Sequence, residues 1–207
     1  MQRFKSGVVL SAFLVAGCTS MSKDECLTVD WRTVGYEDGT RGYSGDRIAQ
    51  HRKDCAKYGV STDLGLYQQG RDQGLREYCT PANGYRIGVQ GGYYAGVCPV
   101  SLEAPFVSAL DSGHQLYSLQ ARVSNTSQQI DYKRHELEQV QRDMMTNAAT
   151  VVSSDSTSQD RAGALADTAH LAEHAGRLKE EIHQLEVDRV RYEADLQAYR
   201  ESQPPIT

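Results

Sequence analysis

Glycines and aromatic residues recur at helical spacing in the stretch that begins at Tyr67. The residues on one helical face are three or four apart: Tyr67, Gly70, Gly74 and Tyr78. Glycine inside a helix costs about 1 kcal/mol relative to alanine, so two on one face need a compensating contact. Close approach of a second backbone or of an aromatic ring supplies such a contact. The spacing therefore predicts a helix whose glycine face packs closely on another element.

A shorter version of this pattern lies between residues 29 and 42. Trp31 is followed by Gly35 and Gly39, and Asp30 is placed to cap a helix that begins there. We expect the two glycine faces to pack against each other, with Asp63 capping the central helix.

Beyond Cys79 the composition changes to that of a loop. Pro81 is followed by five glycines up to residue 96. Because proline and glycine favour turns, we expect this segment to be a compact loop that carries aromatic rings rather than regular structure.

Residues 1–17 have the pattern of a secretory signal peptide. Arg3 and Lys5 precede an apolar run that is too short to remain as a membrane-spanning helix. The run ends in Val15-Ala16-Gly17-Cys18, which resembles a bacterial lipobox. We therefore expect Cys18 to carry lipid and residues 18–28 to form a tether. By resemblance to known lipoprotein sorting, Thr19 in place of Asp after the cysteine implies the outer membrane, and we expect the protein to face the periplasm.

The charge balance argues against nucleic acid as a partner. The net charge is −5, and removing the two cations of residues 1–17 gives −5 − 2 = −7. An acidic chain without a basic cluster is not suited to bind a polyanion or an anionic membrane surface. Membrane attachment is expected only through the lipid on Cys18.

Four further cysteines indicate two disulfides in an exported domain. The alternative, a zinc site, is disfavoured because no two cysteines have a short metal-ligand spacing. Three connectivities are possible. We favour Cys26–Cys55 and Cys79–Cys98, since each closes a local loop.

The composition shifts near residue 100, which predicts a mostly α-helical chain with two parts. Residues 29–101 form a small disulfide-bonded domain rich in glycine and tyrosine, and residues 102–203 form a long antiparallel coiled-coil hairpin with a Ser/Thr-rich tip at 146–160. Residues 204–207 are a tail. The first arm has apolar heptad positions at Leu116, Leu119, Val123, Ile130, Leu137, Val140 and Met144. The second has them at Leu171, Ala175, Leu178, Ile182, Leu185, Tyr192, Leu196 and Tyr199.

Folding the arms back on each other sets the expected register of the hairpin. It places Met144 near Leu165, Ile130 near Leu178 and Leu116 near Tyr192. We expect the arms to pair within one chain rather than between two chains.

The N-terminal pattern resembles a family of bacterial lipoproteins known as domain of unknown function 2799, over about residues 26–117. The matching residues are Asp30-Trp31, Gly35, Asp38-Gly39, His51, Cys55, Tyr67, Gly70, Gly74-Leu75, Tyr78-Cys79, Gly84, Gly88, Gly91, Tyr94, Val97-Cys98-Pro99 and Phe106. The resemblance implies location and fold. It implies no reaction and no ligand.

Few residues suggest chemistry. His170 and His174 are one helical turn apart, but no third ligand converges on them, so we expect a solvated helix face and no metal. His51, Asp54 and Asp38 could do acid–base work, yet without a nucleophile we expect caps and polar helix faces. No cofactor and no enzymatic activity are expected.

Two functions are compatible with this sequence. The preferred one is a non-enzymatic envelope lipoprotein that presents its hairpin to an envelope protein. The alternative is a module that binds glycan or a peptidoglycan fragment through exposed rings. The rings that could line such a groove are Trp31, Tyr36, Tyr67, Tyr85, Tyr93 and Tyr94.

Overall fold

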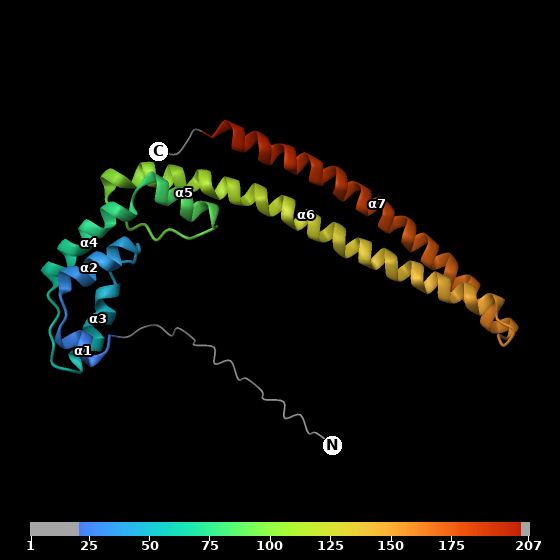
Figure 1. Cartoon of the computed structure of the whole chain (residues 1–207), viewed down its shortest axis with the longest axis horizontal. Helices are drawn as coiled ribbons and strands as arrows, with labels where there is room; N and C mark the ends of the chain where they lie inside the picture. Colours follow the sequence, from blue (N-terminus) through green and yellow to red (C-terminus); the bar gives the residue numbers. More distant parts are fainter. Residues whose placement is uncertain (1–20, 204–207) are drawn as a thin grey trace, which may run out of the picture. The chain divides into compact units, whose positions relative to one another are not determined.

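A computed structural model describes residues 21–203 (Figure 1). The predicted signal peptide, Cys18 and the tail 204–207 lie outside the described residues. The described part is helical and contains no strand, which confirms the predicted fold class. Its helices are α1 (Lys23–Leu27), α2 (Trp31–Thr40), α3 (Arg47–Ala56), α4 (Leu64–Tyr78), α5 (Pro81–Val89), α6 (Val100–Val152) and α7 (Ser158–Ser202).

The chain divides into two compact units. Among the described residues, the first comprises 21–79 with 95–99, and the second comprises 80–94 with 100–203. The sequence had placed the whole of 29–101 in one domain. Residues 80–94 instead belong with the long helices, because α5 packs on α6.

Glycines allow α2 and α4 to pack backbone to backbone in the first unit. A Cβ atom on Gly35 would lie 2.0 Å from the carbonyl oxygen of Tyr67, and one on Gly74 would lie 2.2 Å from that of Tyr36. Gly39 faces Arg71 in the same way, at 2.4 Å. Contacts advance along both helices together, so the helices are parallel. The predicted packing of the two glycine faces is confirmed.

Aspartate caps fix where these two helices begin. The side chain of Asp30 accepts a hydrogen bond from the backbone N–H of Arg32, and that of Asp63 accepts one from the backbone N–H of Leu66. Each satisfies a backbone donor that a helix N-terminus leaves free. Both caps agree with the sequence prediction.

The core of the first unit forms around a disulfide. Cys26 is bonded to Cys55, and both are buried together with Trp31 and Tyr67. Cys79 is bonded to Cys98. Both bridges that the sequence favoured are present.

The predicted loop after Cys79 is wrong, since its first half is the helix α5. Thr80 caps this helix by accepting from the N–H of Asn83, and Pro81 occupies the first turn, where proline is tolerated. Gly84 and Gly88 then face the backbone of α6: their Cβ atoms would lie 2.4 Å and 2.2 Å from the carbonyl oxygens of Phe106 and Leu110. The glycines serve helix contact here and not turn formation.

The same glycine arrangement therefore occurs once in each unit. Gly35, Gly39 and Gly42 have the spacing of Gly84, Gly88 and Gly91. The third glycine of each set has positive φ, 69° and 68°, and abuts a tyrosine ring of the partner helix, Tyr78 and Tyr117 respectively. In both units, two glycines on a short helix and a third just after its end fit it closely against a longer parallel helix.

The second unit is dominated by the hairpin of α6 and α7, which run side by side in Figure 1. The 53 residues of α6 and the 45 of α7 are joined by residues 153–157. Thr157 and Asp160 form a capping box that begins α7. The tip is thus shorter than the predicted 146–160, because α6 continues through Val152.

The register of the hairpin differs from the prediction by about one heptad. Leu178 lies in a cluster with Val140, beside Leu137, and not with Ile130. The ring of Tyr192 lies 4.2 Å from the guanidinium carbon of Arg122, and Tyr199 Oη donates to the carbonyl of Ser112 at 2.7 Å, so Leu116 is not opposite Tyr192. Apolar layers match equally well in registers seven residues apart.

Polar pairs across the seam distinguish these registers. Lys133 pairs with Glu181, and Nη2 of Arg134 lies 2.6 Å from a carboxylate oxygen of Glu186. An apolar heptad pattern carries no information about such pairs.

Candidate functional site

A buried polar cluster lies beside the glycine contact of the first unit. Oδ2 of Asp38, on α2, lies 2.8 Å from Nε2 of His51, on α3, and accepts a hydrogen bond of 2.9 Å from Oη of Tyr67, on α4. The three residues are 3%, 7% and 1% exposed. Because an ionised carboxylate can only accept, Nε2 of His51 carries the proton in this contact. One carboxylate oxygen thus ties three helices together.

Burial governs the titration of Tyr67. Desolvation, followed by the hydrogen bond to Asp38 and its negative charge, raises the pKa of the phenol far above its usual value. Tyr67 therefore stays a neutral donor to Asp38 at every physiological pH.

Asp54 belongs to a second buried contact on α3. Its carboxylate accepts hydrogen bonds from the amide of Gln50, at 3.1 Å and 3.2 Å, and from the backbone N–H of Met21, at 3.3 Å. It is 3% exposed. The expectation that Asp38, His51 and Asp54 are caps or lie on polar helix faces is wrong, since each is buried within a hydrogen-bond network.

Sequence reasoning missed the polar role of Tyr67. It placed this ring on the glycine face but assigned its hydroxyl no partner. Asp38 directly precedes Gly39 and follows Gly35 by three residues, so it must lie near the same buried contact. That position was a usable sign that its carboxylate needs an internal donor.

Asp38 and His51 also line a cavity of about 520 Å³ in the first unit. The cavity follows one face of α2 and its two caps, Asp30 and Arg41, and Arg47 of α3 also lines it. Apolar side chains of Met21, Val29 and Val34 complete its wall. The hydrogen bond to Asp38 fixes the orientation of the His51 ring in this wall.

The aromatic residues proposed for a ligand groove have different environments. Trp31 and Tyr67 are 6% and 1% exposed, so they are core residues and cannot line a surface groove. Tyr36 donates to Glu77 at 2.9 Å. In the second unit, Tyr94 packs on Phe106 with ring centroids 4.9 Å apart, and Tyr85 is half-buried on α5. Only Tyr93, 88% exposed, is a free-standing surface ring among the six.

The two neighbouring histidines of α7 have different environments. His174 lies 3.1 Å from a carboxylate oxygen of Glu136 on the opposite arm, while His170 is exposed. Within residues 21–203, no three His, Cys, Asp or Glu side chains are grouped so that they could hold a metal ion.

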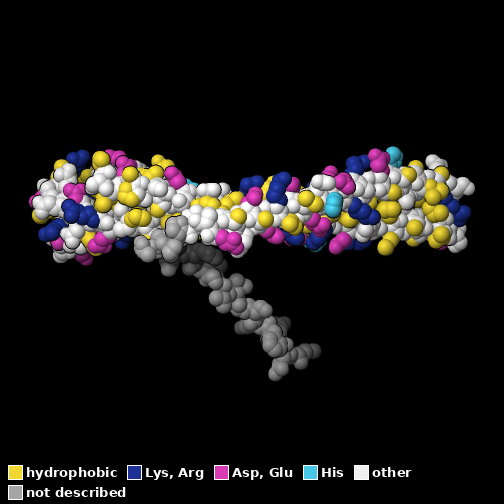
Figure 2. Space-filling view, turned by 90° about the horizontal axis from the view of Figure 1, so that it is seen from above, with side chains coloured by type: hydrophobic (Ala, Val, Ile, Leu, Met, Phe, Trp, Pro, Cys, Tyr) yellow, Lys and Arg dark blue, Asp and Glu magenta, His cyan; other side chains and the backbone are white. Residues whose placement is uncertain are grey.

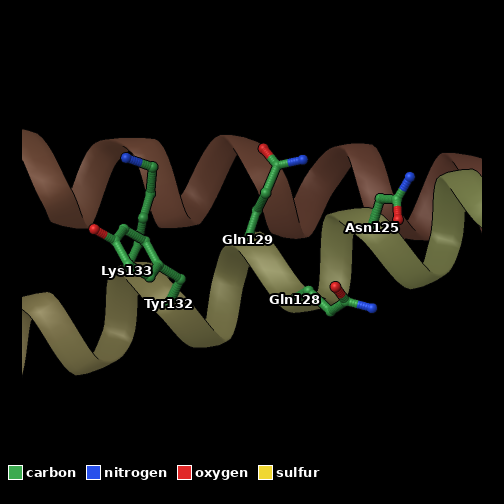
Figure 3. A pocket seen from close by; sticks show the side chains of 5 residues that line it. All are labelled: Asn125, Gln128, Gln129, Tyr132 and Lys133. Atoms are coloured by element: carbon green, nitrogen blue, oxygen red, sulfur yellow. The ribbon is translucent and has the colours of Figure 1, made fainter.

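One face of α6 carries almost no charge. Two adjoining depressions, of about 380 and 310 Å³, share Asn125 and together extend from Tyr117 to Lys133. Figure 3 shows the amide side chains and the tyrosine of the first depression along α6. We call this surface the α6 amide face: Tyr117, Gln120, Ala121, Ser124, Asn125, Gln128, Gln129, Tyr132 and Lys133. Its one charged residue, Lys133, is paired with Glu181.

Apolar side chains gather instead near the turn of the hairpin. Met145, Val152 and Leu165 are 73%, 83% and 59% exposed. Hydrophobic side chains are dense at this end of the hairpin in Figure 2, whereas charged ones are frequent along its middle. The hairpin thus offers two surfaces of different chemistry.

Among the described residues, no helix is both long enough and apolar enough to cross a bilayer.

Comparisons with known proteins agree with the resemblance seen in the sequence. No curated protein matches the chain, and no solved structure matches it. The model of one family, described as "Protein of unknown function (DUF2799)", matches residues 30–115. This range contains both glycine-lined helix contacts, the Asp38–His51–Tyr67 cluster and both cysteines of the second bridge. Over residues 30–115, the chain is similar to the DUF2799 family.

Proposed function

We propose that this chain is a non-enzymatic lipoprotein of the bacterial cell envelope that uses its hairpin to bind another envelope protein. The observation that carries the proposal is the α6 amide face. The apolar seam of the hairpin is occupied by the opposite arm, as in the cluster of Val140, Ala175 and Leu178. A partner is therefore offered a different surface, whose amide side chains at Gln120, Asn125, Gln128 and Gln129 lie outside the apolar seam.

The chemistry of the amide face suits a protein partner. Asn and Gln side chains both donate and accept hydrogen bonds, so they can pair with backbone or side-chain groups of either kind. Tyr117 and Tyr132 are 47% and 70% exposed, and tyrosine is a frequent energetic anchor in interfaces. The near absence of charge lowers the cost of desolvating the face on binding.

Photo-crosslinking in cells tests this proposal. A photoreactive phenylalanine analogue replaces Gln128 in the amide face, or Lys179, which is exposed on α7 outside that face, as the matched control. We expect a discrete protein adduct from position 128 and none from position 179. No adduct from position 128, or the same adducts from both positions, would contradict the proposal.

The lipid anchor is tested separately. We expect Cys18→Ser to release the protein from membranes, or to leave an unprocessed precursor held by its signal peptide. A variant that is processed and still sediments with membranes after alkaline washing would exclude the anchor.

A further inference from the structure

The cavity of the first unit has charges of opposite sign at its two ends. Its main wall is one face of α2, formed by Asp30, Thr33, Val34, Glu37, Asp38 and Arg41. These residues are three or four apart, and Asp30 and Arg41 are separated by about 16 Å at 1.5 Å per residue. Its volume of about 520 Å³ is that of a small-molecule or short-peptide site.

Glu25 and Asp30 make one end anionic. The hydroxyl of Thr33 and then the backbone N–H of Arg32 lower the pKa of Asp30, and hydrogen bonds with Ser22 lower the pKa of Glu25. Both carboxylates are therefore ionised at neutral pH. Each retains lone pairs that can accept from a ligand, because a carboxylate has about four acceptor positions.

Arg41 and Arg47 supply two cations at the other end, where Glu37 also lines the cavity. The guanidinium of Arg47 lies over the ring of Tyr43, 5.1 Å from its centroid, which holds the side chain in place. Among the described residues, none accepts a hydrogen bond from its buried Nε. Arg41 is paired only loosely, at 3.7 Å, with the exposed Glu37.

The middle of the cavity combines apolar and hydrogen-bonding groups. Val29, Val34 and Met21 pack against the core that contains Trp31. Asp38 holds His51 opposite them. Such a wall suits a peptide, whose side chains are apolar or small and whose backbone has both donors and acceptors.

We propose that this cavity binds a short extended peptide with free ends. The ammonium group lies at Glu25 and Asp30, and the carboxylate lies at Arg41 and Arg47. Four extended residues span about 13 Å at 3.3–3.6 Å per residue, which fits within the helical rise of about 16 Å that separates the backbone positions of Asp30 and Arg41. This binding site is independent of the hairpin function proposed above.

Trp31 provides a built-in reporter of binding. It is the only tryptophan of the chain, and it belongs to the core cluster against which Met21, Val29 and Val34 pack. The full chain is titrated with tetraalanine, with N-acetyl-tetraalanine and with tetraalanine amide, followed by tryptophan fluorescence and by calorimetry in parallel. We expect saturable binding of tetraalanine and at least tenfold weaker binding when either end is blocked.

Two variants test whether the carboxylate of the peptide binds at Arg47. Arg47→Gln removes one cation of the cavity, while Arg52→Gln removes an exposed cation of α3 that does not line it. Arg47→Gln should weaken binding of tetraalanine at least fivefold but leave binding of the amide unchanged, and Arg52→Gln should change neither. Circular dichroism verifies that both variants fold.

Three results would overturn the proposal. They are the absence of saturable binding of tetraalanine at millimolar concentration by both methods, equal affinity for the free and blocked peptides, and equal effects of Arg47→Gln and Arg52→Gln.

Discussion

A Cβ atom on Gly70 would lie 1.8 Å from the carbonyl oxygen of Arg32, so no residue but glycine fits between α4 and α2 without moving a backbone. This contact is the closest of the α2–α4 interface. Because backbones face each other here, no side-chain rotation relieves the clash.

We therefore predict that Gly70→Ala lowers the free energy of unfolding by about 1–3 kcal/mol, although alanine favours helix. Gly176→Ala is the matched control, since nothing lies within 4 Å of the position of its Cβ atom. That substitution should stabilise α7 by up to about 1 kcal/mol. Urea unfolding measures both, and a stabilising Gly70→Ala would disprove the backbone contact.

Tyr67→Phe tests the buried cluster. A hydrogen bond to a charged group contributes about 1.5–3 kcal/mol, so we expect the free energy of unfolding to fall by this amount at neutral pH. Tyr93→Phe is the matched control. Because Tyr93 is 88% exposed, we expect its replacement to leave the free energy of unfolding unchanged.

The same variant should change the response to alkali. The folded pKa of Tyr67 is raised above its ordinary value of 10.0, so above pH 10 the unfolded chain loses this proton while the folded chain keeps it. Stability then falls as pH rises. Tyr67→Phe should show a shallower fall above pH 10 than the wild type, and parallel curves would exclude a buried neutral phenol.

Leu178→Ala tests the hairpin seam. Leu178 is 3% exposed and lies beside Val140. Leu→Ala in a core lowers the free energy of unfolding by about 2–5 kcal/mol. We expect the lower end of this range, because a two-stranded seam is less completely buried than a globular core. Leu165→Ala, at a residue 59% exposed, should have little effect. Thermal unfolding of the two variants makes the comparison, and equal losses would contradict the observed register.

The disulfides predict the behaviour of the thiols. Under denaturing, non-reducing conditions, protein from an oxidising compartment should expose no free thiol among Cys26, Cys55, Cys79 and Cys98. Replacing Cys26 and Cys55 together by alanine should cost about 2–4 kcal/mol, because their bridge restricts the unfolded chain. Two or more reactive thiols would refute the bridges.

Local rules predicted much of the first unit. Asp30 and Asp63 act as caps, and the spacing of Gly35, Gly39, Gly70 and Gly74 foretold a close helix contact. The same rules failed at Gly84 and Gly88, where glycines after a proline suggested a loop. Their four-residue spacing equals that of Gly35 and Gly39, and this likeness carried the correct information.

Features that depend on tertiary partners could not be predicted. The heptad pattern required a hairpin but fitted registers one heptad apart equally well, and Lys133–Glu181 and Arg122–Tyr192 distinguish them only once both arms are placed. Likewise, Asp38 and His51 become a buried pair only through Tyr67, which is 29 residues from Asp38 in sequence.

The account depends most on the hairpin closing within one chain in the observed register. Distances between two spin labels in one chain test this directly. One protein is labelled at Gln139 and Gly176, and a second is labelled at Gln139 and Ala169. Both carry Cys18→Ser and are measured in an excess of unlabelled chain. Positions 176 and 169 are one heptad apart on α7 and both exposed. We predict that the 139–176 distance is the shorter of the two. The reverse order would contradict the register. Loss of the short 139–176 distance when unlabelled chain is in excess would show that the arms pair between molecules.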